Sequence, residues 1–155
     1  MNKKSNIDHK VVSDFGKEWQ AFNHQDIDDE SLQSAFNSYF YFFPFDNLKN
    51  AVGFDMGCGS GRWAKFVAPR VGFLNCIDPS DNALEQAKIN LSNFENCSFE
   101  CKGVDENSLA DRSQDFGYSL GVLHHIPNTS LALQACAKKL KSGAPFLLYL
   151  YYRFD

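Results

Sequence analysis

Along most of the chain, short apolar runs alternate with segments in which apolar residues recur at helical spacing. The pattern predicts strands at 51–56, 73–77, 98–102, 116–120 and 145–152, and helices at 62–68, 81–91 and 129–140. Such alternation is typical of βαβ units and a parallel sheet. We therefore expect an α/β fold with a doubly wound, mostly parallel sheet of order 3-2-1-4-5 and helices on both faces. A ligand crevice is expected between the carboxyl ends of strands 1 and 4.

The first 49 residues are expected to form a helical arm that precedes a core at 50–155. Phe15, Trp19 and Phe22 follow an i, i+4, i+7 spacing, and a second apolar stripe at 36–43 ends at Pro44. One interpretation is that both stripes pack against the core, as apolar helical stripes usually do. The other is that the arm is a lid over a ligand, with Trp19 and Phe22 as its main contacts.

Composition argues against several classes of protein. The 155 residues suit one domain, and a net charge of −4 provides no general attraction to phosphate backbones, so no nucleic-acid partner is expected. The longest apolar run, 144–152, is too short to span a bilayer, and the N-terminus lacks the apolar region of a signal peptide. We therefore expect a cytoplasmic protein. The five cysteines lack the spacing of a zinc site, and no metal is expected.

The strongest local signal is a glycine-rich turn between a predicted strand and a predicted helix. Gly57, Gly59 and Gly61 let a ligand approach the backbone without a Cβ atom in the way. Asp78 lies 21 residues after Gly57, near the end of the next predicted strand, which is close to the spacing of a carboxylate that binds a ribose diol. The pattern indicates a nucleoside-containing cofactor. The alternative is that Asp78 only begins the turn at 78–81.

Position 62 separates two classes of nucleoside cofactor. A dinucleotide fingerprint has its third glycine there, because that glycine lets the helix pack closely on the strand. This chain has Arg62 instead, after a G-x-G-x-G pattern. A nicotinamide cofactor is therefore the second choice.

Four segments resemble the motifs of class I (Rossmann-like) S-adenosylmethionine-dependent methyltransferases. The segment 55–61, Asp-x-Gly-x-Gly-x-Gly, is similar to the first motif of that family, and 76–80 is similar to its second-strand motif. The segments 115–125 and 140–144 resemble its fourth-strand motif and the turn before strand 5. The likeness covers about residues 51–152 and is closest to the type 11 family of small-molecule methyltransferases.

The resemblance implies S-adenosyl-L-methionine as the cofactor and S-adenosyl-L-homocysteine as the product. It places Asp55 near the methionine ammonium and Asp78 on the ribose hydroxyls. Asp105 would accept a hydrogen bond from the adenine amine, beside a backbone N–H of Val104 or Glu106. The implied cofactor-binding residues are Asp55, Gly57, Cys58, Gly59, Gly61, Asp78, Pro79, Ser80, Val104, Asp105, Glu106, Gly121 and Val122, together with Trp19 of the arm.

The resemblance also implies transfer of a methyl group to a small-molecule, lipid-like or saccharide acceptor. His124 and His125 follow the fourth predicted strand, and either is a candidate general base because imidazole titrates near neutral pH. Alternatively, one of them packs in the fold and the other faces solvent. Two other functions stay open: a non-catalytic S-adenosylmethionine-binding module and, less favoured by the motifs, a nicotinamide-dependent oxidoreductase.

The chain ends just after the fifth predicted strand. Class I methyltransferases usually continue into a helix and two further strands. The resemblance therefore implies a fragment that lacks the last two strands of the family's sheet and binds the cofactor without efficient turnover. Strand 5 would then be an exposed edge, which favours pairing with another chain. We expect self-association, as a homodimer through this edge or through a nearby apolar face.

Overall fold

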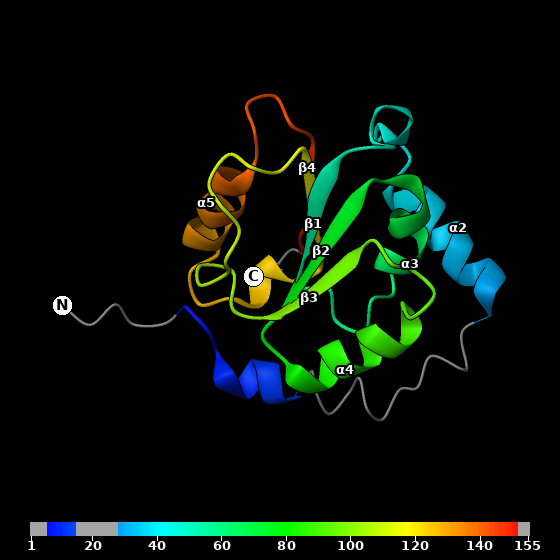
Figure 1. Cartoon of the computed structure of the whole chain (residues 1–155). Helices are drawn as coiled ribbons and strands as arrows, with labels where there is room; N and C mark the ends of the chain where they lie inside the picture. The colour runs from blue at the N-terminus through cyan, green and yellow to red at the C-terminus, as the bar shows by residue number, and fades with distance from the viewer. Residues whose placement is uncertain (1–5, 15–27, 152–155) are drawn as a thin grey trace.

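The computed structural model describes residues 6–14 and 28–151, which form one five-stranded parallel sheet with helices on both faces (Figure 1). The strands are β1 (Val52–Met56), β2 (Phe73–Asp78), β3 (Cys97–Cys101), β4 (Phe116–Leu120) and β5 (Phe146–Tyr149). Their order is β3-β2-β1-β4-β5, and every neighbouring pair is parallel. The sheet order and the fold class expected from the sequence are therefore confirmed.

The helices connect successive strands and cover both faces of the sheet. The α-helices are α2 (Asp29–Tyr39), α3 (Ala64–Val67), α4 (Asp81–Asn90) and α5 (Thr129–Lys139), with a further helical stretch at 9–14. The 3-10 helices are η2 (Phe45–Asn47), η3 (Ala68–Arg70) and η4 (Leu123–His125). In Figure 1, α2, α3 and α4 lie on one side of the sheet and α5 on the other. The helix expected from residue 62 begins two residues later, because a turn occupies the residues before Ala64.

Polar side chains fix where the longer helices begin. Ser80 accepts a hydrogen bond from the backbone N–H of Ala83 at the start of α4, and Asn128 accepts one from Leu131 at the start of α5. Such caps satisfy backbone donors that have no partner within the helix. Ser80 follows β2 by only two residues, so the cap places the first turn of α4 directly above the carboxyl end of that strand.

Two apolar clusters fill the space between the sheet and its helices. On one side, Phe116 and Tyr118 of β4 belong to a cluster that also contains Phe36 and Phe40. On the other side, Phe54, Met56 and Ile77 pack with Ala132 and Cys136 of α5, and all five side chains are nearly inaccessible. Burial on both faces is what the centre of a parallel sheet requires, and it is most complete in β1 and β4, whereas β3 and β5 at the edges are only partly buried.

The two central strands pack closely because each offers a glycine to the other strand's phenylalanine. Gly53 of β1 lies opposite Phe116 of β4, and Phe54 of β1 lies opposite Gly117 of β4. A Cβ atom on Gly117 would come within 2.3 Å of the Phe54 ring, and one on Gly53 within 2.4 Å of the Phe116 ring. The glycines therefore provide the room in which the two rings lie against the sheet.

The second apolar stripe of the arm packs into the core. Phe36 of α2 is 2% exposed, and its ring centroid lies 4.5 Å from that of Phe40 and 5.0 Å from that of Phe66. The packing interpretation therefore holds for this stripe. The first stripe, with Phe15, Trp19 and Phe22, lies outside the described residues, so its role stays a prediction, as does the boundary between arm and core. No helix within 6–14 and 28–151 is long and apolar enough to cross a membrane.

Replacing Phe36 by alanine should destabilise the domain strongly, because the change leaves a cavity among packed rings. Removing a buried phenylalanine side chain costs about 3–5 kcal/mol. The matched control is Phe42→Ala, because Phe42 belongs to the same stretch of chain but is 92% exposed. Urea unfolding should show a large loss of stability for Phe36→Ala and a much smaller change for Phe42→Ala. Similar losses for the two variants would contradict the packing described for α2.

Candidate cofactor site

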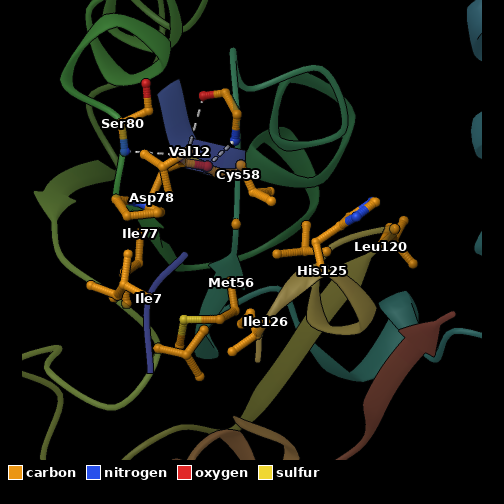
Figure 2. A pocket seen from close by; sticks show the side chains of 18 of the residues that line it. Ile7, Val12, Met56, Cys58, Ile77, Asp78, Ser80, Leu120, His125 and Ile126 are labelled. Atoms are coloured by element: carbon orange, nitrogen blue, oxygen red, sulfur yellow. Dashed lines mark hydrogen bonds between the residues drawn. The ribbon is translucent and has the colours of Figure 1, made fainter. Parts of the chain in front are cut away.

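A cavity of about 520 Å³ lies over the carboxyl ends of the strands, where the sequence places the ligand crevice. Its lining includes a residue that follows each of the five strands: Gly57, Pro79, Lys102, Gly121 and Tyr151. The volume falls within the range of pockets that hold small molecules and cofactors. Figure 2 shows Asp78 and Ser80 on one side of this cavity and His125 and Leu120 on the other.

The loop after β1 leaves its strand through a glycine that no other residue can replace without strain. Gly57 has a φ of 79°, and a Cβ atom there would lie 2.5 Å from the side chain of Val122. The N–H groups of Gly57 and Cys58 both donate to the carbonyl of Ile77, at 2.7 and 3.1 Å. These bonds tie the loop to the end of β2, and the missing side chain lets Val122 pack directly against the backbone of Gly57.

Asp78, at the end of β2, holds the same loop through its carboxylate. Oδ2 accepts a hydrogen bond from the N–H of Gly59 at 2.9 Å, and Oδ1 accepts one from the N–H of Ser80 at 2.9 Å (Figure 2). Burial raises the pKa of Asp78, and the two backbone hydrogen bonds offset part of that shift. Because a carboxylate has about four acceptor positions, each oxygen retains capacity to accept a ligand hydroxyl.

The beginning of the described chain forms one wall of the cavity, which the sequence did not reveal. Ile7, Val11 and Val12 line it, and Figure 2 shows Ile7 and Val12 on the same segment close to Ile77 and Asp78. Asn6 anchors this segment to the start of α5: its Nδ2 donates to the carbonyl of Asn128 at 3.1 Å, and its Oδ1 accepts from the N–H of Asn128 at 2.9 Å. Ile7 precedes the helical stretch at 9–14, so no helical spacing in the sequence marks Ile7, Val11 and Val12 as one apolar surface.

The turn after β4 brings both predicted histidines to the cavity. His124 and His125 line it next to Gly121 and Val122, with 3.9 Å between the two imidazole centroids and 4.9 Å from His124 to the Tyr151 ring. Burial lowers the pKa of both histidines, and His125 lowers that of His124 further. Both rings are therefore neutral at physiological pH. Among the described residues, the two ring nitrogens of His124 have no hydrogen-bond partner.

Most of the predicted cofactor residues come together at the cavity, but some do not line it. Those that do are Gly57, Cys58, Gly59, Asp78, Pro79, Ser80, Val104, Gly121 and Val122. Asp105 and Glu106 are exposed and do not line the cavity. Gly103 and Val104 line it in their place. Gly61 faces Leu91 of the core, and Trp19 lies outside the described residues. The cofactor roles of all these residues stay predictions.

Asp55 lies behind the cavity wall, inside the sheet. It is 2% exposed, and its Oδ2 has no hydrogen-bond partner among the described residues. Burial raises the pKa of Asp55 to about 8; the nearby Tyr118 hydroxyl offsets part of this shift, whereas the charge of Asp78 adds to it. The Asp55 carboxyl is therefore largely protonated at neutral pH. A protonated carboxyl carries no charge with which to attract an ammonium group, so the expected contact with the methionine ammonium stays a prediction.

Several lining residues were not predicted from the sequence. Arg62, Trp63, Lys102 and Tyr151 contribute polar or aromatic groups, and Met56, Ile77, Leu120 and Ile126 contribute apolar ones. Their positions next to the glycine loop and the strand ends were visible in the sequence, but which way each side chain faces was not. Within the described part of the chain, no group of three or more His, Cys, Asp or Glu residues could hold a metal ion.

Comparison with known proteins identifies the family. The family model described as a methyltransferase domain matches residues 54–148. The ubiquinone biosynthesis O-methyltransferase of Nitrosomonas europaea is 33% identical over 99 residues, which cover 62% of this chain and 42% of that protein. The tRNA U34 carboxymethyltransferase of Aliarcobacter butzleri is 30% identical over 107 residues, which cover 68% of this chain and 35% of that protein. Among solved structures, the N-methyltransferase NodS of Bradyrhizobium japonicum in complex with S-adenosyl-L-homocysteine aligns with a TM-score of 0.72 and 17% identity, over 84% of this chain and 67% of that one.

The chain belongs to the methyltransferase domain family, because the family model matches more than half of its residues. The resemblance to class I S-adenosylmethionine-dependent methyltransferases is thereby confirmed. The solved structure of NodS shares the fold of this chain. The chain spans 42% and 35% of the length of the two curated relatives described above.

Asp55→Asn should make the stability of the domain less dependent on pH. The pKa of Asp55 rises from 3.8 to about 8 on folding, so its contribution to stability is complete below 3.8 and is lost as the pH rises towards 8. Asparagine keeps the shape of the neutral carboxyl, and the variant should therefore be more stable than the unmodified chain at pH 8. Denaturant unfolding at several pH values measures this difference.

The control for this prediction is Asp111→Asn, which should change stability in the opposite direction. Lys138 and Lys139 lower the pKa of Asp111, so its charge stabilises the fold at neutral pH and the variant should be slightly less stable there. If the free energy of unfolding of Asp55→Asn varies with pH as that of the unmodified chain does, the buried carboxyl of Asp55 does not titrate in this range.

Proposed function

We propose that this domain binds S-adenosylmethionine and transfers its methyl group to a hydroxyl oxygen of a small-molecule acceptor. The observation that carries the proposal is the Asp78 carboxylate, which lines the cavity of about 520 Å³ beside the glycine loop. A ribose presents two neighbouring hydroxyls, and a carboxylate at the end of the second strand is the group that accepts from them in nucleoside-binding folds. Membership of the methyltransferase domain family supports a methyl donor over a nicotinamide dinucleotide.

The residues around the cavity fit this cofactor along its length. Asp78 and the loop at 57–61 suit the ribose, while Ile7 and Val104 offer apolar surface for the adenine ring on the β3 side. Gly57 allows Val122 to pack against the loop beside the cavity, because a Cβ atom at Gly57 would collide with Val122. When bound, this cofactor supplies a methyl group on a positively charged sulfur. The surrounding residues would hold the acceptor in line with that group, and such positioning supplies a large part of the rate in group transfer.

His124 and His125 suit the role of general base towards the acceptor. An acceptor hydroxyl must lose its proton as the new carbon–oxygen bond forms, and a neutral imidazole nitrogen can take that proton. The lowered pKa values of both rings keep them neutral, and the two ring nitrogens of His124 have no hydrogen-bond partner among the described residues. Oxygen as the accepting atom is supported by the relative named a ubiquinone biosynthesis O-methyltransferase.

The expected partners are only partly supported. A small-molecule acceptor suits the cavity, but the relative named a tRNA U34 carboxymethyltransferase makes RNA the competing class. The net charge of −4 opposes RNA, because phosphate backbones are bound through positive surfaces. The absence of a nucleic-acid partner and the homodimer through β5 both stay predictions, as does the cellular location.

The sharpest test of cofactor binding is Asp78→Asn. Hydrogen bonds to a charged group contribute about 1.5–3 kcal/mol, so the variant should bind S-adenosylhomocysteine roughly ten- to a hundredfold more weakly. Calorimetric titration of the unmodified chain with S-adenosylmethionine, S-adenosylhomocysteine and NAD provides the reference. The matched control is Asp81→Asn, three residues further along in the first turn of α4, which should bind as the unmodified chain does. Tight binding of NAD in place of S-adenosylhomocysteine would overturn the proposal.

The general-base role is tested by His124→Gln and His125→Gln. The resemblance implies that turnover by these residues alone is slow, so the quantity to compare is the remaining rate. Loss of a general base lowers a rate by about 10²–10⁴-fold, so one of the two variants should lose this methyl transfer to a hydroxyl-bearing acceptor while its affinity for S-adenosylhomocysteine stays unchanged. In the unmodified chain, the rate should fall as the pH drops through the lowered histidine pKa, because a protonated ring cannot accept a proton. If both variants keep the full rate, positioning alone accounts for the transfer.

A further inference from the structure

The segment at 6–14 contacts two connections that leave the sheet on opposite sides of its central strand. At its start, Asn6 is hydrogen-bonded to Asn128, where α5 begins. At the next position, Ile7 rests on Gly103 in the loop after β3, and a Cβ atom on Gly103 would lie 2.7 Å from Cδ1 of Ile7. Strand β3 is one edge of the sheet, whereas α5 connects β4 to β5 beyond β1. The segment therefore bridges two sides of the cavity that it lines.

The same segment has an apolar side and a polar side. Ile7, Val11 and Val12 are partly buried and line the cavity. The side chains at 8–10 and 13–14 are exposed, and they comprise two aspartates, a histidine, a lysine and a serine. This polar side needs no new partner when the segment moves into water. Separation from the cavity therefore costs only the contacts of the apolar side and the hydrogen bonds that hold the segment.

Asn6 holds the segment through a reciprocal pair of hydrogen bonds. Its Nδ2 donates to the carbonyl of Asn128 at 3.1 Å, and its Oδ1 accepts from the N–H of Asn128 at 2.9 Å. Both bonds use the backbone of Asn128, whose side chain separately caps α5 by accepting from the N–H of Leu131. Both are also exposed, so water competes for the same groups. The pair can therefore break without removing the cap of α5.

We propose that the segment at 6–14 is a gate for the cofactor and that Asn6 is its latch; this inference rests on the proposed function. The gate is closed when Asn6 is bonded to Asn128 and Ile7 rests on Gly103, and it is open when both contacts are lost. Figure 2 shows the segment close to Asp78, where the ribose is proposed to bind, so a bound cofactor has this segment as a wall. The segment lies outside the residues that the family model matches.

A latch of this kind has its own kinetic signature. The two hydrogen bonds join parts of the chain to each other, so they stabilise the closed form equally with and without the cofactor. Weakening them raises the open fraction by the same factor in the free chain and in the complex. The cofactor then enters and leaves faster by that factor, and its affinity is unchanged. Loss of a contact with the ligand behaves differently, because it speeds release more than uptake.

Asn6→Ala gives the direct test, read by stopped-flow tryptophan fluorescence because Trp63 lines the cavity. The rates of S-adenosylhomocysteine uptake and release should both rise about five- to tenfold, the lower part of what two hydrogen bonds contribute, while the Kd changes less than about twofold. Asn6→Asp should act in the same direction. It keeps the size of the side chain but places an acceptor, in place of the Nδ2 donor, against the carbonyl of Asn128.

Two further variants separate a gate from other roles. The matched control is Asn37→Ala, which removes an exposed hydrogen bond from Gln33 within α2 and should leave both rates as in the unmodified chain. Ile7→Ala removes apolar surface from the cavity wall, so it should speed release more than uptake and weaken binding.

The outcomes distinguish this inference from the proposal on which it rests. If Asn6→Ala leaves both rates unchanged, the cofactor does not pass this segment and the gate is wrong. If release alone becomes faster and affinity falls in proportion, the segment is a fixed wall of the site. The proposed function stands in both cases, and it fails if the unmodified chain does not bind S-adenosylhomocysteine. Near-ultraviolet circular dichroism checks the fold of each variant, and an unfolded fraction lowers the amplitude of the signal without changing the rates.

Discussion

Asp78 accepts one hydrogen bond from Gly59 in the loop after β1 and another from Ser80, which caps α4. A single carboxylate thereby joins two crossover connections that start from neighbouring strands. Burial disfavours the ionised form of Asp78, and the hydrogen bonds from the two backbone N–H groups offset part of that cost. The ionised carboxylate and the conformation of the loop therefore stabilise each other. Because Asp78 also lines the cavity, the group that fixes the local fold is part of the candidate site as well.

The fold could be predicted because each of its elements has a local signal in the sequence. Strands buried on both faces read as short apolar runs, and Ser80 marks the start of α4 as a helix cap. The site could be predicted as far as it depends on backbone conformation: Gly57 and Gly59 have positive φ angles, and the spacing to Asp78 follows from the length of one βαβ unit. These features are local, and a one-dimensional pattern is sufficient to show them.

The remaining parts of the site depend on contacts between residues far apart in the chain, for which the sequence gives little signal. Asn6 meets Asn128 across 122 residues, and this contact places Ile7 at the cavity. Asp55 belongs to the glycine motif by sequence, yet the pleat of β1 turns its carboxyl into the core beside Tyr118, where the raised pKa keeps it neutral. Arg62 follows the same motif and faces the cavity. The spacing of a motif specifies its backbone, whereas the direction of each side chain depends on the surrounding strands and helices.

The histidines after β4 illustrate how burial and chemistry work together in this cavity. A protonated imidazole would repel a positively charged sulfur and could not accept a proton, so a base at this position must be neutral. Packing of His124 between His125 and Tyr151 disfavours the charged form of the ring, and no acidic partner favours that form within the described part of the chain. An aspartate beside the ring would raise the histidine pKa and favour the protonated form. An aromatic environment at the end of β4, with the acid held apart at the end of β2, therefore suits both the proposed cofactor and the proposed base.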